Sequence, residues 1–343
     1  MSARDWGTTG ASLSDYRLGF RDVQNATNQR TLIAALVPGS PCGNKVPILT
    51  LNSLHARLEL LSSLASFESD RALRLKMSQG TVNWFYMEEV PVVRRSALAP
   101  LERNLRQRSV LAQSGTSPRF APVWTAFCEP NQGWRTGWAI LGPERVRMRA
   151  ALDALDALHC GLSYADLSVL LRDCDLPQAR ISPSRLDPKG FWRVDKDKHP
   201  ELRHTVLTRI AFIDLEEKIR ACGGEREAGI EAFVRQNGGQ GWMPPEAVRL
   251  ADYGLGHDER AYHPQPVASQ LGPRFYDWQI SQSTEESWRE CHLHARNLLG
   301  ASGYRQLLPD MDATRLGKAP GDDMHVEETP AKYVPQRTLF DSE

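Results

Sequence analysis

The chain has 343 residues, of which 41% are hydrophobic and 24% charged, the usage of an ordinary globular protein rather than a fibrous or disordered one. Its length suits two domains, or one domain with a large appendage. The formal net charge is zero, which excludes a generally basic protein that binds any polyanion.

The charges are unevenly distributed along the chain. Residues 1–120 hold 15 Lys and Arg against 9 Asp and Glu, and the remainder holds 27 against 33. The first third therefore carries an excess of +6 and the rest an excess of −6. A basic first third is expected if that part faces phosphates, although ordinary surface variation also produces such a difference.

Nothing in the sequence indicates a membrane or an oxidising compartment. No run of about 18 apolar residues is present, so no membrane span is predicted. The start, MSARDWGTTGASLSDYR, lacks a basic region followed by an apolar core and is not a secretory signal. Six scattered cysteines without a C-x-x-C pair indicate reduced thiols, so we predict a cytoplasmic protein.

Short strands and a helix are predicted in the first third of the chain. Tyr16, Leu18 and Phe20 alternate with polar residues, and residues 31–37 are mostly apolar, which predicts two strands around a polar turn. Leucines spaced three and four apart predict a helix over 50–66. Residues 83–93 are interpreted as a short, largely buried strand that ends on Pro91.

The rest of the chain is predicted to be mainly helical. Helices are expected after Pro143, after a Ser163-x-x-Asp166 capping box, and over about 201–221, 225–236 and 284–299. A polar break at 112–119 suggests a domain boundary. The predicted fold class is α+β: a partial recognition domain at 1–111, a mainly helical domain at 120–305, and a disordered tail at 306–343.

No catalytic set is predicted. Asn83-Trp84-Phe85-Tyr86 has the Asn and the aromatic residue of an amino-methyltransferase signature but neither of its prolines, and no glycine-rich cofactor loop is evident. Glu216-Glu217-Lys218 matches the E-x-K of a metal-dependent nuclease, but its context is helical and predicts a solvated face. Cys291, His292 and His294 would diverge on a helix, so no metal site is predicted.

Recognition of DNA remains as a function, because Arg, Asn, Gln and Thr contact base edges and Arg and Lys neutralise phosphates. Two polar segments, 21–30 and the predicted loop 71–81, concentrate these residue types between apolar elements. They could equally be two polar surface loops. The residues predicted first for DNA contact are Arg21, Asn25, Thr27, Asn28 and Arg30, followed by Arg74, Lys76, Gln79, Thr81 and Asn83.

The order of several segments resembles a known family. YRLGFRDVQNATNQRTLIAALVP, LNSLHARLELLSSLASF and GTVNWFYMEEVPV, followed by FWRVDKDKHPELRHT and GWMPPEAVRLADYGLGHD, resemble the target-recognition and helical region of type IIG adenine-specific restriction–modification methyltransferases, as in DISARM-type phage defence. The resemblance covers most of residues 15–300. It implies double-stranded DNA as partner, and it places Trp84 and Tyr86 in the core in preference to stacking on bases.

The sequence departs from that family in one respect. The family carries an upstream S-adenosylmethionine domain with a Pro-Pro-Tyr or Pro-Pro-Phe signature, which is not found here. The resemblance therefore implies a split subunit or a gene fragment, with no cofactor in this chain and S-adenosylmethionine in a partner or in a missing N-terminal domain. Alternatives are a protein–protein adaptor without DNA affinity, and an enzyme whose site is completed in trans.

The last residues contain a short docking pattern. Gln336, Leu339 and Phe340 fit the Q-x-x-L-F pattern with which bacterial proteins bind the replication sliding clamp. Such a peptide would become ordered on binding and bury its Leu and Phe in an apolar pocket. The sliding clamp is therefore a further predicted partner.

Overall fold

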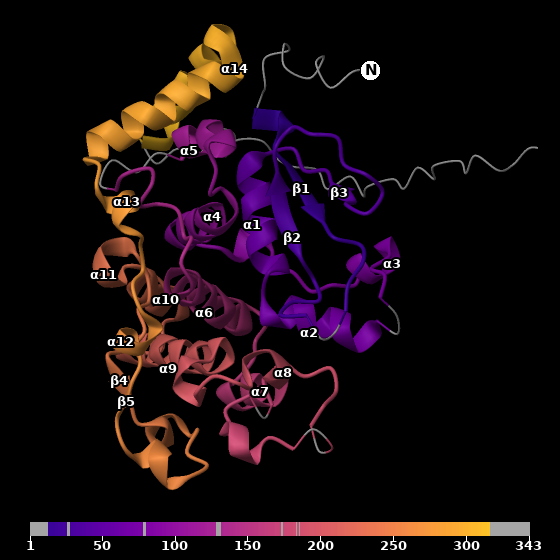
Figure 1. The fold of residues 1–343 in the computed structure, drawn as a ribbon, viewed down its shortest axis with the longest axis vertical. Coiled ribbons are helices and arrows are strands. Elements are labelled where there is room, and N and C mark those ends of the chain that lie inside the picture. The colour runs from indigo at the N-terminus through magenta and orange to yellow at the C-terminus, as the bar shows by residue number, and fades with distance from the viewer. Residues whose placement is uncertain are drawn as a thin grey trace, which may run out of the picture.

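The computed structural model describes residues 13–25, 28–77, 80–127, 132–172, 174–182, 184 and 186–315. The fold is α+β, with helices predominating and two small antiparallel sheets (Figure 1). The elements in chain order are β1 (Arg17–Phe20), β2 (Ala34–Val37), β3 (Ile48–Leu49), α1 (Leu54–Leu64), α2 (Phe67–Lys76), α3 (Trp84–Met87), α4 (Pro100–Ser114), α5 (Ala121–Ala126), α6 (Gly142–His159), α7 (Tyr164–Leu170), α8 (Trp192–Asp195), α9 (His204–Ala221), α10 (Arg226–Val234), α11 (Gln236–Gly239), β4 (Ala247–Val248), β5 (Gln265–Pro266), α12 (Ala268–Leu271), α13 (Asp277–Ile280) and α14 (Thr284–Arg315).

The first sheet has the order β2-β1-β3, with β1 antiparallel to both neighbours. Leu18 pairs with Leu36 on one side and Leu49 on the other, so apolar side chains meet across the sheet. Helix α1 packs against β1 and β2 with its leucines and begins at Ser53, whose side chain accepts a hydrogen bond from the Ala56 amide. These elements confirm the predicted strand–turn–strand unit and the helix that follows it.

Two predictions for the first third are wrong, and one helix was not predicted. Residues 83–93 do not form a buried strand, because α3 makes one helical turn there and exposes 43% of Trp84 and 55% of Phe85. Residues 67–76, predicted partly as a loop, form α2, which begins at Ser66 and has acids in its first turn and Arg74 and Lys76 in its last. Helix α4 was not predicted at all.

The helical part follows the predictions more closely. Helices α6 and α10 lie within one or two residues of the expected positions, and α9 begins three residues after its predicted start and ends where predicted. Helix α7 begins at the predicted capping box between Ser163 and Asp166. Helix α14 begins as predicted at Thr284, but its backbone continues through a non-helical Gly300 to Arg315. It therefore extends past residue 306, where the tail was predicted to begin.

The hydrophobic core consists of two clusters that both draw on distant segments. One lies around α6, α9 and α10 and includes Phe67 and Leu105 from the first third of the chain. The other lies between the first sheet, α1, α4, α5 and α14, and it combines Leu18 with Trp124 and Trp288. Packing thus crosses the break at 112–119, and neither cluster is confined to one side of it.

Buried charges join the same elements. Arg106 of α4 donates to Glu102 of its own helix at 2.8 Å, to Asp156 of α6 at 2.7 Å and to the Ser62 hydroxyl of α1 at 3.2 Å. His159 Nε2 lies 2.9 Å from the Glu102 carboxylate. A buried charge is tolerated only when it is paired, so this network requires α1, α4 and α6 to assemble together.

No helix in the described part of the chain is both long and apolar enough to cross a membrane. The cysteines at positions 42, 160, 174, 222 and 291 are free thiols.

Candidate functional site

A short β-bridge joins the two segments in which DNA contacts were predicted. Val23 pairs with Thr81, the Gln24 amide donates to the Gly80 carbonyl, and the Val82 amide donates to the Asp22 carbonyl, both at 2.7 Å. Residues 21–25 and 80–85, which are far apart in the sequence, therefore lie side by side. We call these residues the bridge face.

Side chains alternate along the bridge face as they do along a strand. Asp22, Gln24 and Val82 are half-buried or buried. The residues on either side of these three point outward, because successive side chains in extended backbone lie on opposite sides. The outward-pointing, exposed members that were predicted to contact DNA are Arg21, Asn25, Thr81 and Asn83. The structure brings these four residues together.

Two aromatic rings border the bridge face. Trp84 packs edge-on against Phe20 of β1 with ring centroids 5.3 Å apart, which holds its position while 43% of it stays exposed. Phe85 lies 4.0 Å from the Tyr86 ring and is 55% exposed. Tyr86 itself packs against the second core cluster. Exposed rings beside polar side chains can stack on bases. Trp84 was expected in the core together with Tyr86, and its exposure corrects that expectation, which followed from reading residues 83–93 as a buried strand.

Arg74 lies in the interior and Arg30 is half-buried, and the contacts of both serve the fold. Arg74 is fully buried, pairs with Asp70, and donates to the Asn28 carbonyl at 2.9 Å and the Gln29 carbonyl at 3.3 Å. Arg30 lies 3.2 Å from Asp153, and its guanidinium is 3.7 Å from the centre of the Phe67 ring. Arg74 is not placed for the predicted contact with DNA, because a fully buried guanidinium does not reach a phosphate. Arg30 is half-buried, and its guanidinium is engaged by Asp153 and the Phe67 ring.

The remaining residues predicted to contact DNA are half-buried, paired with an acid, or outside the described residues. Asn28 is half-buried and its side-chain amide donates to Gln24 at 3.4 Å. Lys76 is partly exposed but forms an ion pair with Glu89. Thr27 and Gln79 lie outside the described residues, as does the clamp-type segment with Gln336, Leu339 and Phe340.

Charge at the bridge face is nearly balanced. Two lysines outside the bridge face pair with acids at or near it. Lys45 lies 3.2 Å from Asp22, and Lys76 is paired with Glu89, so the positive charge of each lysine is offset by a carboxylate. Arg21 forms no ion pair with any residue that the structure describes. The face therefore suits hydrogen bonding and stacking better than strong attraction of phosphates.

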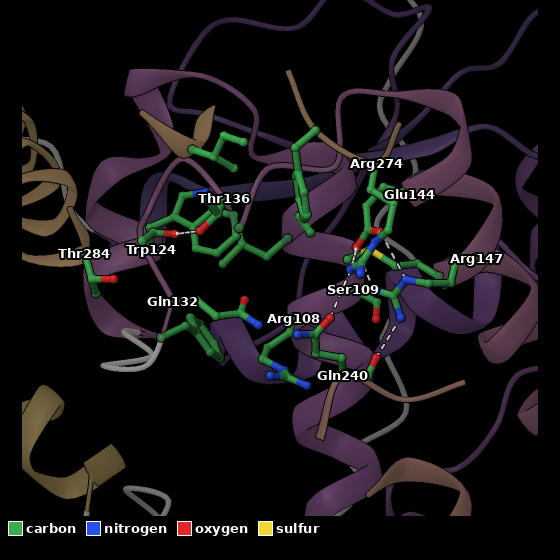
Figure 2. A pocket seen from close by; sticks show the side chains of 18 of the residues that line it. Arg108, Ser109, Trp124, Gln132, Thr136, Glu144, Arg147, Gln240, Arg274 and Thr284 are labelled. Atoms are coloured by element: carbon green, nitrogen blue, oxygen red, sulfur yellow. Dashed lines mark hydrogen bonds and ion pairs between the residues drawn. The ribbon is translucent and has the colours of Figure 1, made fainter. Parts of the chain in front are cut away.

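A separate cavity of about 300 Å³ opens between α4, α5, α6, α13 and the start of α14 (Figure 2). Its apolar wall includes Trp124, Phe127 and Trp288, and its polar wall includes Arg108 and Arg274. In Figure 2 the cluster around Arg274, Glu144 and Arg147 lies toward one side and Trp124 toward the other. No sequence motif indicated this cavity, because its lining comes from elements up to about half the chain apart.

Glu144 is the only acid that lines the cavity within the described residues, and two arginines hold it. Arg147 donates to its carboxylate at 2.6 and 3.1 Å, and Arg274 at 2.6 and 3.3 Å. Burial opposes ionisation of Glu144, but the hydrogen bonds from Arg147 and Arg274 outweigh it and lower the pKa of the carboxyl. Arg108, whose Nη2 donates to the Gly239 carbonyl at 2.6 Å, is the third arginine of the lining, so three guanidinium groups and one carboxylate give the lining a net charge of +2.

Neither feature carries a recognisable catalytic set. Glu216 and Lys218 lie on α9, as their helical context predicted. Among the described residues, no group of three His, Cys, Asp or Glu side chains is placed to hold a metal ion. A scan against protein-family models, a search of curated proteins and a search of solved structures each found no match.

Proposed function

We propose that the chain is the DNA-recognition part of an adenine-specific methyltransferase system of the restriction–modification or phage-defence kind, acting in the cytoplasm. The observation that carries the proposal is the bridge between Val23 and Thr81. It gathers Arg21, Asn25, Thr81 and Asn83 on one exposed surface beside two exposed rings. Arg, Asn and Thr are the side chains that read base edges in the major groove.

The methyl transfer itself is assigned to another protein or domain. S-adenosylmethionine would be bound there, and the present chain would supply only the choice of DNA sequence. The buried Arg74 and the half-buried Arg30 hold the segments that carry the bridge face, because both guanidinium groups tie residues 28–30 to helix α2 and its surroundings. A fixed loop suits base recognition, since a small displacement of a reading side chain breaks its hydrogen bonds.

The test is selection from a randomised duplex pool by the purified chain at about 50 and about 200 mM salt. We expect one short sequence to be enriched, with a shallow dependence on salt because only one cation of the face is unpaired. Arg21→Ala should weaken binding, and Asn83→Ala should relax the preference at one base pair, at a cost of about 1–3 kcal/mol.

The matched control is Arg220→Ala, which removes an exposed arginine from α9. It should bind and select as the wild type does. If Arg220→Ala and Arg21→Ala weaken binding equally, the contact is a general charge effect and the assignment of the bridge face is wrong. A chain that melts cooperatively and binds no duplex at either salt concentration would contradict DNA recognition altogether.

A second candidate function is that of an adaptor that binds a protein partner. The observation in its favour is that exposed aliphatic side chains accompany the exposed rings of Trp84 and Phe85: Val92 follows them in the sequence, and Val23 pairs with Thr81 just before them. Exposed apolar groups of this kind also mark protein interfaces. Retention of a methyltransferase partner by the wild type but not by Trp84→Ala, without DNA binding, would favour this function.

A further inference from the structure

The cavity beside Glu144 has no part in the proposed recognition of DNA. Its lining divides into an apolar wall of aromatic rings and a polar wall of guanidinium and amide groups. Ligand sites in proteins typically have volumes of about 300–1,000 Å³, mostly apolar walls and a few placed polar groups. At about 300 Å³ the cavity can hold one compact ligand.

The charge of the polar wall selects the kind of ligand. Arg147 is fully occupied, because it donates to Glu144 and, through Nη1, to the Gln240 carbonyl at 2.7 Å. Arg274 uses Nε and Nη2 on Glu144 and on the Gln240 side chain at 3.0 Å. Its Nη1 has no hydrogen-bond partner among the described residues, and its side chain is 35% exposed. A donor is thus available to a bound anion.

Glu144 does not repel such an anion. Its carboxylate is already covered by two guanidinium groups, and the net charge of the lining remains +2 with Arg108 included. Two positive charges match the roughly −2 charge of a phosphate monoester at neutral pH better than the single charge of a carboxylate.

The opposite wall suits a planar ring. Trp124 is fixed because its indole N–H donates to the Gly115 carbonyl at 2.8 Å, and Trp288 is fixed by a bond to the Gln132 carbonyl at 2.6 Å. Rings whose orientation is fixed in this way lose little freedom when a second ring packs against them. Thr136 and Thr284 lie near the same wall (Figure 2). The Thr136 hydroxyl donates to the Gly133 carbonyl at 2.7 Å, so its oxygen can accept from a base edge, and the Thr284 hydroxyl can donate or accept.

From this arrangement we infer that the cavity between α4, α5, α6 and α14 binds a nucleoside monophosphate, with the phosphate at Arg274 and Arg108 and the base against Trp124 and Trp288. A free nucleotide and a terminal nucleotide of a DNA strand present the same chemistry. The two sources differ in size, and only the first fits wholly within the cavity.

Calorimetric titration of the full chain tests the inference with adenosine 5′-monophosphate, adenosine, inorganic phosphate, benzoate and a 5′-phosphorylated single-stranded oligonucleotide as probes. We expect the monophosphate to bind at least tenfold more tightly than adenosine, phosphate or benzoate. Tighter binding of the oligonucleotide than of the monophosphate would identify a strand end as the source of the ligand, and the inference of a free nucleotide would then be wrong.

Two variants locate the binding. Arg274→Ala should weaken the monophosphate at least tenfold and leave adenosine unchanged. Ile280→Trp, at an exposed position on the cavity lining, should narrow the entrance and weaken both without unfolding the chain. Arg235→Ala serves as the control, because it also removes an exposed, carboxylate-paired arginine, but one at the C-terminal end of α10.

Each outcome decides the inference. No binding of the monophosphate at millimolar concentration would overturn it, and so would equal affinity for adenosine and its monophosphate. Equal losses in Arg274→Ala and Arg235→Ala would show that the anion is held by general charge alone. Because the variants leave the bridge face intact, their selection of duplex DNA should not change, which separates this inference from the proposed recognition of DNA.

Discussion

At the scale of single residues, burial separates arginines of the same apparent type. Arg21 and Arg74 both lie in segments rich in polar residues, and the sequence alone gives them similar roles. In the structure Arg21 is exposed, whereas Arg74 is fully buried against Asp70 and lies 4.2 Å from the centre of the Phe191 ring. The difference arises because Arg74 lies on the buried side of α2, a helix whose last residues were predicted from the sequence to be a loop.

This difference gives a stability prediction for Arg74. Arg74→Met should lower the free energy of unfolding by about 3–5 kcal/mol, because it leaves Asp70 buried without its cation. Arg21→Ala should change it by less than about 0.5 kcal/mol. Chemical denaturation of both variants measures the two values. A small loss for Arg74→Met would mean that the side chain is exposed in solution, and its predicted contact with DNA would then deserve a direct test.

At the scale of elements, the spacing of apolar residues predicted several helices whose apolar faces are buried in the core. Helices α1, α6 and α9 have leucines and other apolar residues on one face, and that face is buried in the two clusters. Ser163 and Asp166 form the capping box that their spacing predicted. Local signals sufficed because each of these elements is long or has a capping side chain.

Helix α2 can be tested by removing its cap. The Ser66 side chain accepts a hydrogen bond from the Ser69 amide, and Ser66 is buried, so water cannot replace the bond. Ser66→Ala should therefore cost about 0.5–2 kcal/mol of unfolding free energy. Ser283→Ala at the exposed start of α14 should cost less, and equal costs measured by denaturation would contradict the role of burial.

The remaining elements could not be predicted for a physical reason. Residues 83–93 are rich in aromatic and β-branched side chains, which favour strands. In the structure a turn of helix follows Asn83 instead. Trp84 stays half-exposed, because its packing partner Phe20 meets it edge-on. The cavity also has no local signal. Arg274 reaches Glu144 across 130 positions, and such a contact is determined by packing alone.

At the scale of the whole molecule, buried acids between α2, α4 and α6 link stability to pH. Burial raises the pKa of Asp156 to about 6 despite the opposing effect of Arg106, and nearby Asp153 and Glu102 raise it further. Burial and the charges of Asp153 and Asp156 also raise the pKa of Glu68. These carboxyl groups bind protons more tightly in the folded state than in the unfolded chain.

The sign of the resulting pH dependence follows from that order. Between the ordinary value of 3.8 and about 6, folded Asp156 is protonated while unfolded Asp156 is not, so its contribution to stability falls as pH rises through this window. Relative to the wild type, Asp156→Asn should gain about 3 kcal/mol across that range. Denaturation at pH 4, 5 and 6.5 measures this. A difference that stays constant with pH would contradict a raised pKa for Asp156.

The second core cluster couples the two ends of the chain. Trp288 of α14 is buried in this cluster together with Leu18 of β1. Phe120 and Tyr16 are buried there as well, with their ring centroids 5.8 Å apart. The Tyr16 hydroxyl donates to the Arg119 carbonyl at 2.5 Å, which ties the sheet to the segment that α14 covers. The sheet therefore depends on a helix about 270 positions later in the sequence.

Replacing Trp288 tests that coupling. Trp288→Ala should lower the unfolding free energy by about 3–5 kcal/mol through the cavity it leaves, and it should speed hydrogen exchange of the β1 amides. Trp278→Ala is the matched control, because Trp278 is 41% exposed and should cost less than about 1 kcal/mol. If Trp288→Ala speeds exchange in α14 and α5 only, the sheet is stable without them, and the break at 112–119 separates two independently folding units. If exchange rises in β1 as well, the bridge face, which follows directly after β1 in the chain, depends on the whole chain, and a recognition fragment that ends at residue 111 will not bind DNA.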